Sequence, residues 1–313
     1  MTLGIIFNGQ GAQKLGMGLD FAQAFPQSRA VFELAQDQSD YPLETWISQD
    51  LSPLRQTRHA QVAIAAASLA IYQGLEPLLA NYQDRVYAGL SLGEYSALVA
   101  AGCLSMDQVF GLLKARGNLM SMHCQSLEKT AMLACMEVSE DQLLQTIHDL
   151  ALQNKVMLAN YNSPQQIVVA GFHSDLQVFT KALKQAGYKK VLPLKVEGPF
   201  HTSLMSPIQE AFAQVLSKVA FSQAKYPVYS NVNHEIHDPK TIRDRLVDHL
   251  TAPVKWTQTM EAWHEAGIKQ IIQIGPGSTL SKLLAQHLPD IPVYDINQVE
   301  DLRGLETFLR SEP

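Results

Sequence analysis

The chain has 313 residues, of which 46% are hydrophobic and 17% charged, so it can bury a large core and is typical of an ordinary globular protein. Its formal net charge of -6, with no long basic stripe, argues against a nucleic-acid partner. The sequence has no basic leader and no apolar run that approaches a membrane span, so we expect a cytoplasmic protein outside the membrane. The three cysteines lack metal-type spacing, and we expect reduced thiols and no metal or redox cofactor.

The first third of the chain predicts the start of a parallel sheet. A strand over residues 3–7 runs into a glycine-rich loop, residues 8–13, and the pattern is then helical to about residue 84. Residues 62–70 are rich in alanine and apolar on most faces, which predicts a buried helix against that sheet. A short apolar run at 86–88 and a helical stretch at 94–101 follow.

The middle of the chain changes rhythm and predicts a separate small domain. The expected order is β-α-β-β-α-β, the ferredoxin-like pattern. Its elements are strand 131–138, helix 140–152, strands 156–160 and 166–170, helix 175–186 and strand 190–196. We therefore predict an α/β protein with a large domain over 1–126 and 197–313 and an inserted small domain over 127–196. Further core strands are expected at 228–230 and 271–274.

A candidate nucleophile lies between the short strand and its helix. The sequence Gly89-Leu90-Ser91-Leu92-Gly93 is a G-x-S-x-G motif in the strand-to-helix context of a nucleophile elbow. A helix that starts just after Ser91 directs free N–H groups and its positive dipole end towards an oxyanion on that hydroxyl. Ser91 is therefore the first candidate for a covalent catalyst.

A serine hydroxyl needs a base, and the chain offers ten histidines. His201 follows Gly198-Pro199-Phe200 at the point where the chain leaves the inserted domain, so it can face a cleft between domains. The other histidines lie in helix-surface or polar contexts, and His234 and His237 belong to a loop that we expect to be exposed. Asp141, Asp149 and Asp175 lie between Ser91 and His201 but fall on the inserted domain rather than at the end of a core strand. We therefore expect a dyad, with a backbone carbonyl orienting the base.

Two groups of basic residues have alternative interpretations. Arg116, late in an apolar helix, is either a surface arginine or a guanidinium that pairs with a substrate carboxylate. The lysines around Gly187 are either a solvated helix end or a basic patch for an acidic partner; they are Lys181, Lys184, Lys189 and Lys190.

Taken together, these motifs resemble the malonyl-CoA:acyl carrier protein transacylases and the acyltransferase domains of polyketide synthases. The resemblance covers nearly the whole chain and depends on several motifs in the same order. They are Gly9-Gln10-Gly11-Ala12-Gln13, the elbow with Glu94-Tyr95-Ser96, Arg116-Gly117, Asn162-Ser163-Pro164, Gly198-Pro199-Phe200-His201, Pro253-Val254-Lys255-Trp256 and Gly275-Pro276-Gly277.

The resemblance implies an α/β-hydrolase-like core with a ferredoxin-like insertion, and a ping-pong transfer. Ser91 would take malonyl from malonyl-CoA as a serine ester, with His201 as base and then acid. The backbone N–H groups of Gln10 and Leu92 would form the oxyanion hole. The phosphopantetheine thiol of an acyl carrier protein would then remove the acyl group.

The same resemblance assigns substrate contacts. Arg116 would bind the malonyl carboxylate, which favours malonyl over acetyl because acetyl leaves a buried cation unpaired. Gln61 matches a glutamine that lines the family's pocket, and Phe200 matches the malonyl-type pattern and should crowd a methyl branch. His249 is counted among the substrate-site residues.

Two departures from the family pattern leave questions open. Leu90 stands where histidine is usual, and His249 stands where a glutamine usually orients the base through its carbonyl. An imidazole there can shift the pH dependence of the dyad. The alternatives are an acyl-editing serine hydrolase on the same fold and a non-catalytic carrier-docking module. The sequence does not separate fatty acid from polyketide synthesis, and we expect a monomer.

Overall fold

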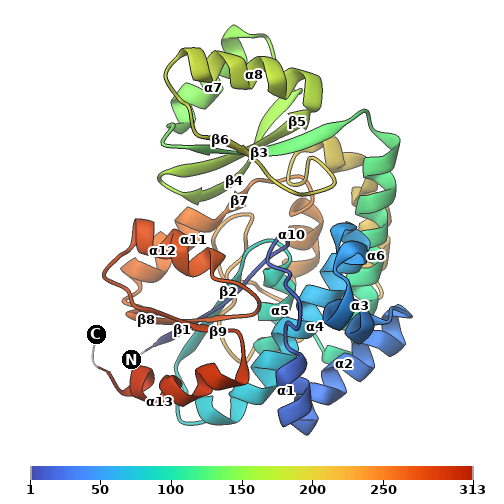
Figure 1. Ribbon diagram of the computed structural model, residues 1–313, viewed down its shortest axis with the longest axis vertical. Helices are drawn as coiled ribbons and strands as arrows, with labels where there is room; N and C mark the ends of the chain where they lie inside the picture. The colour runs from blue at the N-terminus through green and yellow to red at the C-terminus, as the bar shows by residue number, and fades with distance from the viewer. Residues whose placement is uncertain (1, 312–313) are drawn as a thin grey trace.

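The computed structural model describes residues 2–311 and has a larger part and a smaller part, each built on its own sheet (Figure 1). Residues 130–193 form most of the smaller part, and a two-residue strand from later in the chain joins its sheet. The strands are β1 Leu3–Phe7, β2 Arg85–Gly89, β3 Thr130–Met136, β4 Val156–Ser163, β5 Gln166–Phe172, β6 Val191–Pro193, β7 Val254–Lys255, β8 Gln270–Ile274 and β9 Val293–Ile296. The α-helices are α1 Leu19–Ala24, α2 Pro26–Ser39, α3 Leu43–Gln49, α4 Thr57–Leu75, α5 Gly93–Ala100, α6 Met106–Ser126, α7 Glu140–Asp149, α8 His173–Gln185, α9 Gln209–Leu216, α10 Ile242–Asp248, α11 Trp256–Glu265, α12 Thr279–His287 and α13 Leu302–Arg310. Short 3₁₀ segments are η1 Ser52–Arg55, η2 Glu76–Leu79, η3 Ser203–Ile208 and η4 Val299–Asp301.

The sheet of the larger part is parallel, in the order β2-β1-β8-β9. Alternate residues of β1 point to opposite faces of the sheet and pack into different hydrophobic cores. Ile6 packs with α11 and α12 on one face, and Ile5 and Phe7 pack with the helices on the other face. Both faces are therefore covered, and the strand is apolar along its whole length, as expected of a buried parallel strand. The carboxyl ends of β1, β2 and β8 meet at one edge, where ligands bind in open parallel sheets.

Helix α4 is buried on nearly all sides, which confirms the prediction for residues 62–70. Its small side chains let α2 and α6 approach closely, and it also contacts β8. Among residues 2–311, one helical stretch, Thr57–Leu79, is long and apolar enough to cross a membrane. The expectation that no run approaches a span was therefore wrong. However, 78% of its most apolar window is buried inside the fold, as in a core helix.

The smaller part has the predicted element order, with sheet order β6-β3-β5-β4-β7. Its strands are antiparallel except for β4 and β7. Helices α7 and α8 lie together above one face of this sheet (Figure 1). They close a separate core that includes Val169, Phe179 and Leu183. The predicted ends of the six elements differ from the observed ones by at most three residues.

Other sequence predictions need correction. The predicted strand 228–230 forms only isolated bridges, Tyr87 to Val228 and Tyr229 to Ile236. The sequence analysis missed β7 and β9. Strand β7 has only two residues and gains its pairing from β4 of the smaller part, so only the tertiary fold makes it a strand.

Candidate active site

Ser91 lies in a sharp turn between β2 and α5, with a left-handed φ of 52°. The two motif glycines make this turn possible. A Cβ on Gly93 would lie 2.1 Å from the carbonyl oxygen of Phe7, and one on Gly89 would lie 2.1 Å from the carbonyl carbon of Gly93. Any larger residue would push the strand and helix apart. The local geometry is that of a nucleophile elbow.

His201 reaches Ser91 directly: its Nε2 lies 2.7 Å from the Ser91 Oγ. Its Nδ1 lies 2.8 Å from the backbone oxygen of His249, the residue that caps the C-terminal end of α10. A carbonyl only accepts, so Nδ1 carries the hydrogen and Nε2 presents its lone pair to the serine hydroxyl. His201 also has a left-handed φ, 61°. The predicted pairing and its carbonyl acceptor are both present in the geometry.

The environment of His201 keeps the imidazole neutral. Burial and, to a lesser extent, the positive charge of Arg116 together lower the pKa of His201 to about 3, against the opposing effect of the His249 carbonyl. The side chain therefore has a free lone pair near neutral pH. Glu197 anchors the segment that leads to His201, because its carboxylate accepts hydrogen bonds from the Thr57 N–H at 2.5 Å and from the Ser121 hydroxyl at 2.8 Å.

Gln10 and Leu92 come from the loops that follow β1 and β2, and both line the same cavity as Ser91. Among residues 2–311, neither backbone N–H has a hydrogen-bond partner. The loops approach closely at Gly9, where a Cβ would lie 2.4 Å from the Leu90 oxygen. Two backbone donors without partners among the described residues therefore belong to loops that line the cavity of Ser91, which is consistent with an oxyanion site.

Arg116 is buried in α6, with 1% of its surface exposed, so the surface alternative is wrong. It lies over the Tyr95 ring, 5.2 Å from guanidinium carbon to ring centre. Within the described part of the chain, its Nε and Nη2 have no hydrogen-bond partner. A buried guanidinium with free donors is costly unless an anion pairs with it. Gly117 lets α6 approach Arg58, whose Cα would lie 2.7 Å from an added Cβ.

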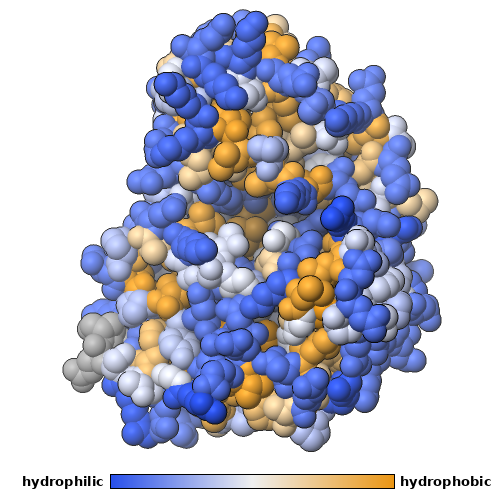
Figure 2. Space-filling view, in the orientation of Figure 1, coloured by the Kyte–Doolittle hydropathy of each residue, from blue (hydrophilic) through white to orange (hydrophobic). Residues whose placement is uncertain are grey.

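These residues surround a cavity of about 380 Å³ between the two parts. In the space-filling view this face is hollowed between the parts, with apolar side chains inside the hollow (Figure 2). Gln61 lines the cavity, and its amide oxygen has no partner among residues 2–311. Leu90 and Phe200 also contribute to the wall. His249 does not line it but lies behind His201, with the base rather than with the substrate space.

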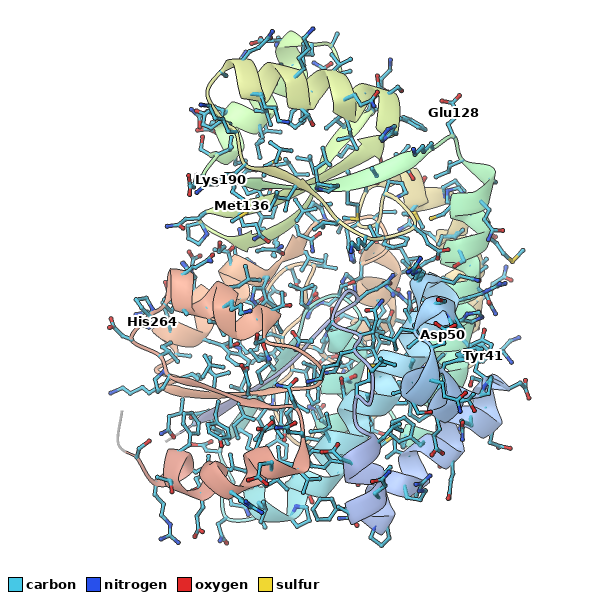
Figure 3. All side chains as sticks on the ribbon, in the orientation of Figure 1. Tyr41, Asp50, Glu128, Met136, Lys190 and His264 are labelled. Carbon is cyan, nitrogen blue, oxygen red and sulfur yellow. The ribbon has the colours of Figure 1, made fainter. Side chains whose placement is uncertain are left out.

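A second cavity, of about 470 Å³, lies on the smaller part between α8 and β3. Lys181 and Lys184 line it, but none of the predicted site residues does. Lys190 lies at the outer edge of the smaller part (Figure 3), paired with Glu137 at 2.6 Å. Ser91, His201 and Arg116 therefore belong to the first cavity and not to the second.

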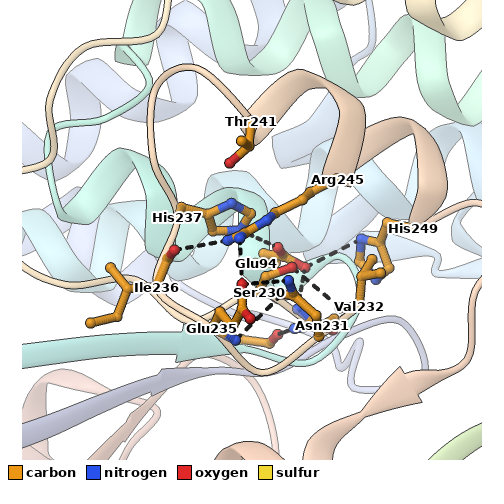
Figure 4. A network of polar contacts seen from close by, with 12 residues as sticks. Glu94, Ser230, Asn231, Val232, Glu235, Ile236, His237, Thr241, Arg245 and His249 are labelled. Atoms are coloured by element: carbon orange, nitrogen blue, oxygen red, sulfur yellow. Dashed lines mark hydrogen bonds and ion pairs between the residues drawn. The ribbon is translucent and has the colours of Figure 1, made fainter.

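The sequence analysis missed a buried polar network behind the dyad (Figure 4). Glu94, directly after the elbow motif, contacts His237 and His249, and Asn231 bonds to the elbow backbone. His237 was expected to be exposed, but its side chain is 1% exposed. The available signal was Glu94 itself, a charge in an otherwise apolar helix start.

A profile of the acyl transferase domain matches residues 5–309. The chain belongs to the acyl transferase family. A malonyl CoA-acyl carrier protein transacylase of Haemophilus influenzae is 33% identical, over 97% of this chain and 98% of that protein. The resemblance drawn from the motifs is thereby confirmed.

Solved structures of family members are similar along the whole chain. One is a malonyl-transacylase in complex with a type II polyketide synthase acyl-carrier protein, 34% identical, with a TM-score of 0.92 over 98% of this chain and 100% of that one. Another is an acyl carrier protein S-malonyltransferase of Vibrio cholerae, 33% identical, with a TM-score of 0.89 over 97% and 99%. The mixed α/β fold with a parallel sheet is common to them.

Proposed function

We propose that this acyl transferase moves a malonyl group from malonyl-CoA to the phosphopantetheine thiol of an acyl carrier protein, through a serine ester. One observation carries the proposal most directly. The Ser91–His201 pair shares a cavity with the buried, unpaired guanidinium of Arg116. The names of the relatives in the family support the same donor and acceptor.

The first half-reaction loads the enzyme. His201 Nε2 takes the Ser91 hydroxyl proton as the Oγ forms a bond to the thioester carbon. The Gln10 and Leu92 N–H groups receive the negative charge of the tetrahedral intermediate. When the carbon–sulfur bond breaks, the His201 proton goes to the departing CoA thiolate. The same steps in reverse, with the carrier thiol as nucleophile, release the acyl group and restore Ser91.

Arg116 selects the donor in this proposal. Its Nε and Nη2 form a planar fork that matches a carboxylate. Malonyl carries a free carboxylate at its far end and acetyl does not. Gln61, on the same cavity wall, would donate from its amide nitrogen, which lies 3.1 Å from Met120 Sδ, to an oxygen of the acyl group. His249 would contribute through the base and not through substrate contact.

The finer architecture is also a proposal. We infer an α/β-hydrolase-like core formed by residues 1–126 and 197–313, and a ferredoxin-like insertion formed by 127–196. The strand order β6-β3-β5-β4 and the two helices on one face support the insertion. Strand β7 lies outside residues 127–196 but extends the sheet of the insertion. One chain supplies the whole site, namely the dyad, Arg116 and both backbone donors, and this favours a monomer. The three cysteines are free thiols, and this favours a reducing, cytoplasmic setting.

Intact-protein mass spectrometry tests the proposal. The protein is exposed briefly to malonyl-CoA or acetyl-CoA, and a phosphopantetheinylated carrier protein is then added. Ser91→Ala should abolish a malonyl adduct that Ser48→Ala, at an exposed serine on α3, retains. Movement of the adduct to the carrier supports transfer. Loss to water regardless of the carrier would favour an editing hydrolase, and no adduct in the unmodified protein would overturn acyl transfer.

A further inference from the structure

Glu94 is a carboxylate inside the core, with 1% of its side chain exposed, and its partners lie on every side (Figure 4). Its Oε1 lies 2.5 Å from His237 Nε2. Its Oε2 lies 3.3 Å from His249 Nδ1 and accepts the Asn231 N–H at 3.3 Å. A buried carboxylate needs such partners to remain in place. Their identity shows what Glu94 connects.

The first connection leads to the nucleophile. Asn231, fixed at its N–H by Glu94, accepts the Ser91 N–H on its Oδ1 at 2.7 Å. Its Nδ2 donates to the Gly89 oxygen at 2.8 Å. One side chain therefore bridges both sides of the turn that holds Ser91 in its left-handed conformation. Such a conformation persists only where the surroundings enforce it.

The second connection leads to the base. The His249 backbone oxygen accepts from His201 Nδ1, and its ring stacks on the His201 ring, with centres 4.9 Å apart and planes at 28°. The edge of the His249 ring faces Glu94. Burial lowers the pKa of His249 well below its usual value, as do the nearby His201 ring and the positive charge of Arg116, so the His249 ring is a neutral spacer.

The reaction adds a second positive charge next to this network. Proton transfer from Ser91 creates an imidazolium on His201 in a site where Arg116 already carries a positive charge. We propose that Glu94 is a positioning residue that fixes both members of the dyad, and that its negative charge, across the His249 ring, stabilises protonated His201. The proposal rests on the proposed function only in that Ser91 and His201 react as a pair.

The other ionisable groups around this assembly are few. Arg116 faces it from α6, Tyr95 from α5, and His237 from the loop before α10. The contact with His237 holds the Glu94 carboxylate in place, and the negative charge of Glu94 acts against the positive charge of Arg116. The nearby Glu235–Arg245 pair, 2.7 Å apart, is on the surface, with 64% of the Glu235 side chain exposed. It provides a matched control.

Labelling of Ser91 by a fluorophosphonate tests the inference without any acyl donor. The maximal labelling rate and the half-saturating probe concentration are measured near neutral pH, together with thermal stability. We expect Glu94→Gln to lower the maximal rate by about 10- to 100-fold, less than the contribution of a complete general base, at an unchanged half-saturating concentration. Glu235→Gln should match the unmodified protein in both.

Glu94→Asp separates charge from shape. Aspartate keeps the charge but leaves a cavity, whereas glutamine keeps the shape and loses the charge. We expect Glu94→Asp to be less stable than Glu94→Gln and yet to label faster. Labelling rates that follow the stability order would overturn the proposal.

His249→Gln is a second, independent variant, because it keeps the backbone carbonyl but removes the stacked ring. We expect a lower maximal rate at unchanged half-saturation, and an unchanged rate would count against the proposal even if Glu94 variants fail to fold. A protein that labels in this pattern but takes no malonyl adduct would refute the proposed function and leave this inference intact.

Discussion

Replacing Arg116 by alanine should invert the enzyme's preference between acyl donors. In the described structure the guanidinium is buried and offers two free donors, Nε and Nη2. A hydrogen bond to a charged group contributes about 1.5–3 kcal/mol, so two contribute about 3–6 kcal/mol. At 1.36 kcal/mol for each factor of ten, malonyl loading should slow by roughly 10²- to 10⁴-fold.

Acetyl loading should respond differently to the same substitution. Acetyl has no carboxylate, and Arg116 lowers the pKa of His201, so its removal makes the base stronger. We expect the acetyl rate to remain within about threefold or to rise, since no acetyl contact is lost. Arg116→Lys should fall between, because lysine keeps the charge but not the planar fork.

Initial rates of adduct formation, measured by intact mass with each donor, decide the matter. Lys114→Ala is the control, because Lys114 lies on the same helix and pairs with Asp40 at the surface. Equal losses with malonyl and acetyl would refute the carboxylate role and indicate a general structural defect. An unchanged malonyl rate would refute it more directly.

Two further predictions concern stability. Gly93→Ala should lower the free energy of unfolding by denaturant by about 3 kcal/mol, because the added Cβ would lie 2.1 Å from the Phe7 carbonyl oxygen. Gly111→Ala is the control: a Cβ added there would have no atom within 4 Å, so this substitution should be neutral or stabilising. Equal effects of the two substitutions would exclude the close approach at Gly93. Folding lowers the pKa of His201 from about 6.5 to about 3, so between these pH values the unfolded state binds more protons than the folded state. The free energy of unfolding should therefore decrease as the pH is lowered below about 6.5, by up to about 1.4 kcal/mol for each pH unit. His201→Gln should flatten this dependence, measured as urea midpoints between pH 5 and 7, and an equally steep profile would place the titration elsewhere.

The sequence alone determined the features that depend on local pattern. A glycine on each side of Ser91, a strand before it and a helix after it specified the elbow, because only that turn needs both glycines. Apolar periodicity gave the element order of the smaller part to within three residues. The sequence context indicated His201 and Arg116 as candidates, and the motif order indicated the family and with it their roles.

Only the tertiary structure decided what depends on contacts between distant segments. Strand β7 exists because β4 pairs with it, and the burial of His237 follows from Glu94, 143 residues earlier. The lysines around Gly187 lie away from the Ser91 cavity, whereas Arg116 became a buried, unpaired cation through the packing of α6. A sequence pattern records which face of an element is apolar, but it does not record which polar groups meet once the faces are packed.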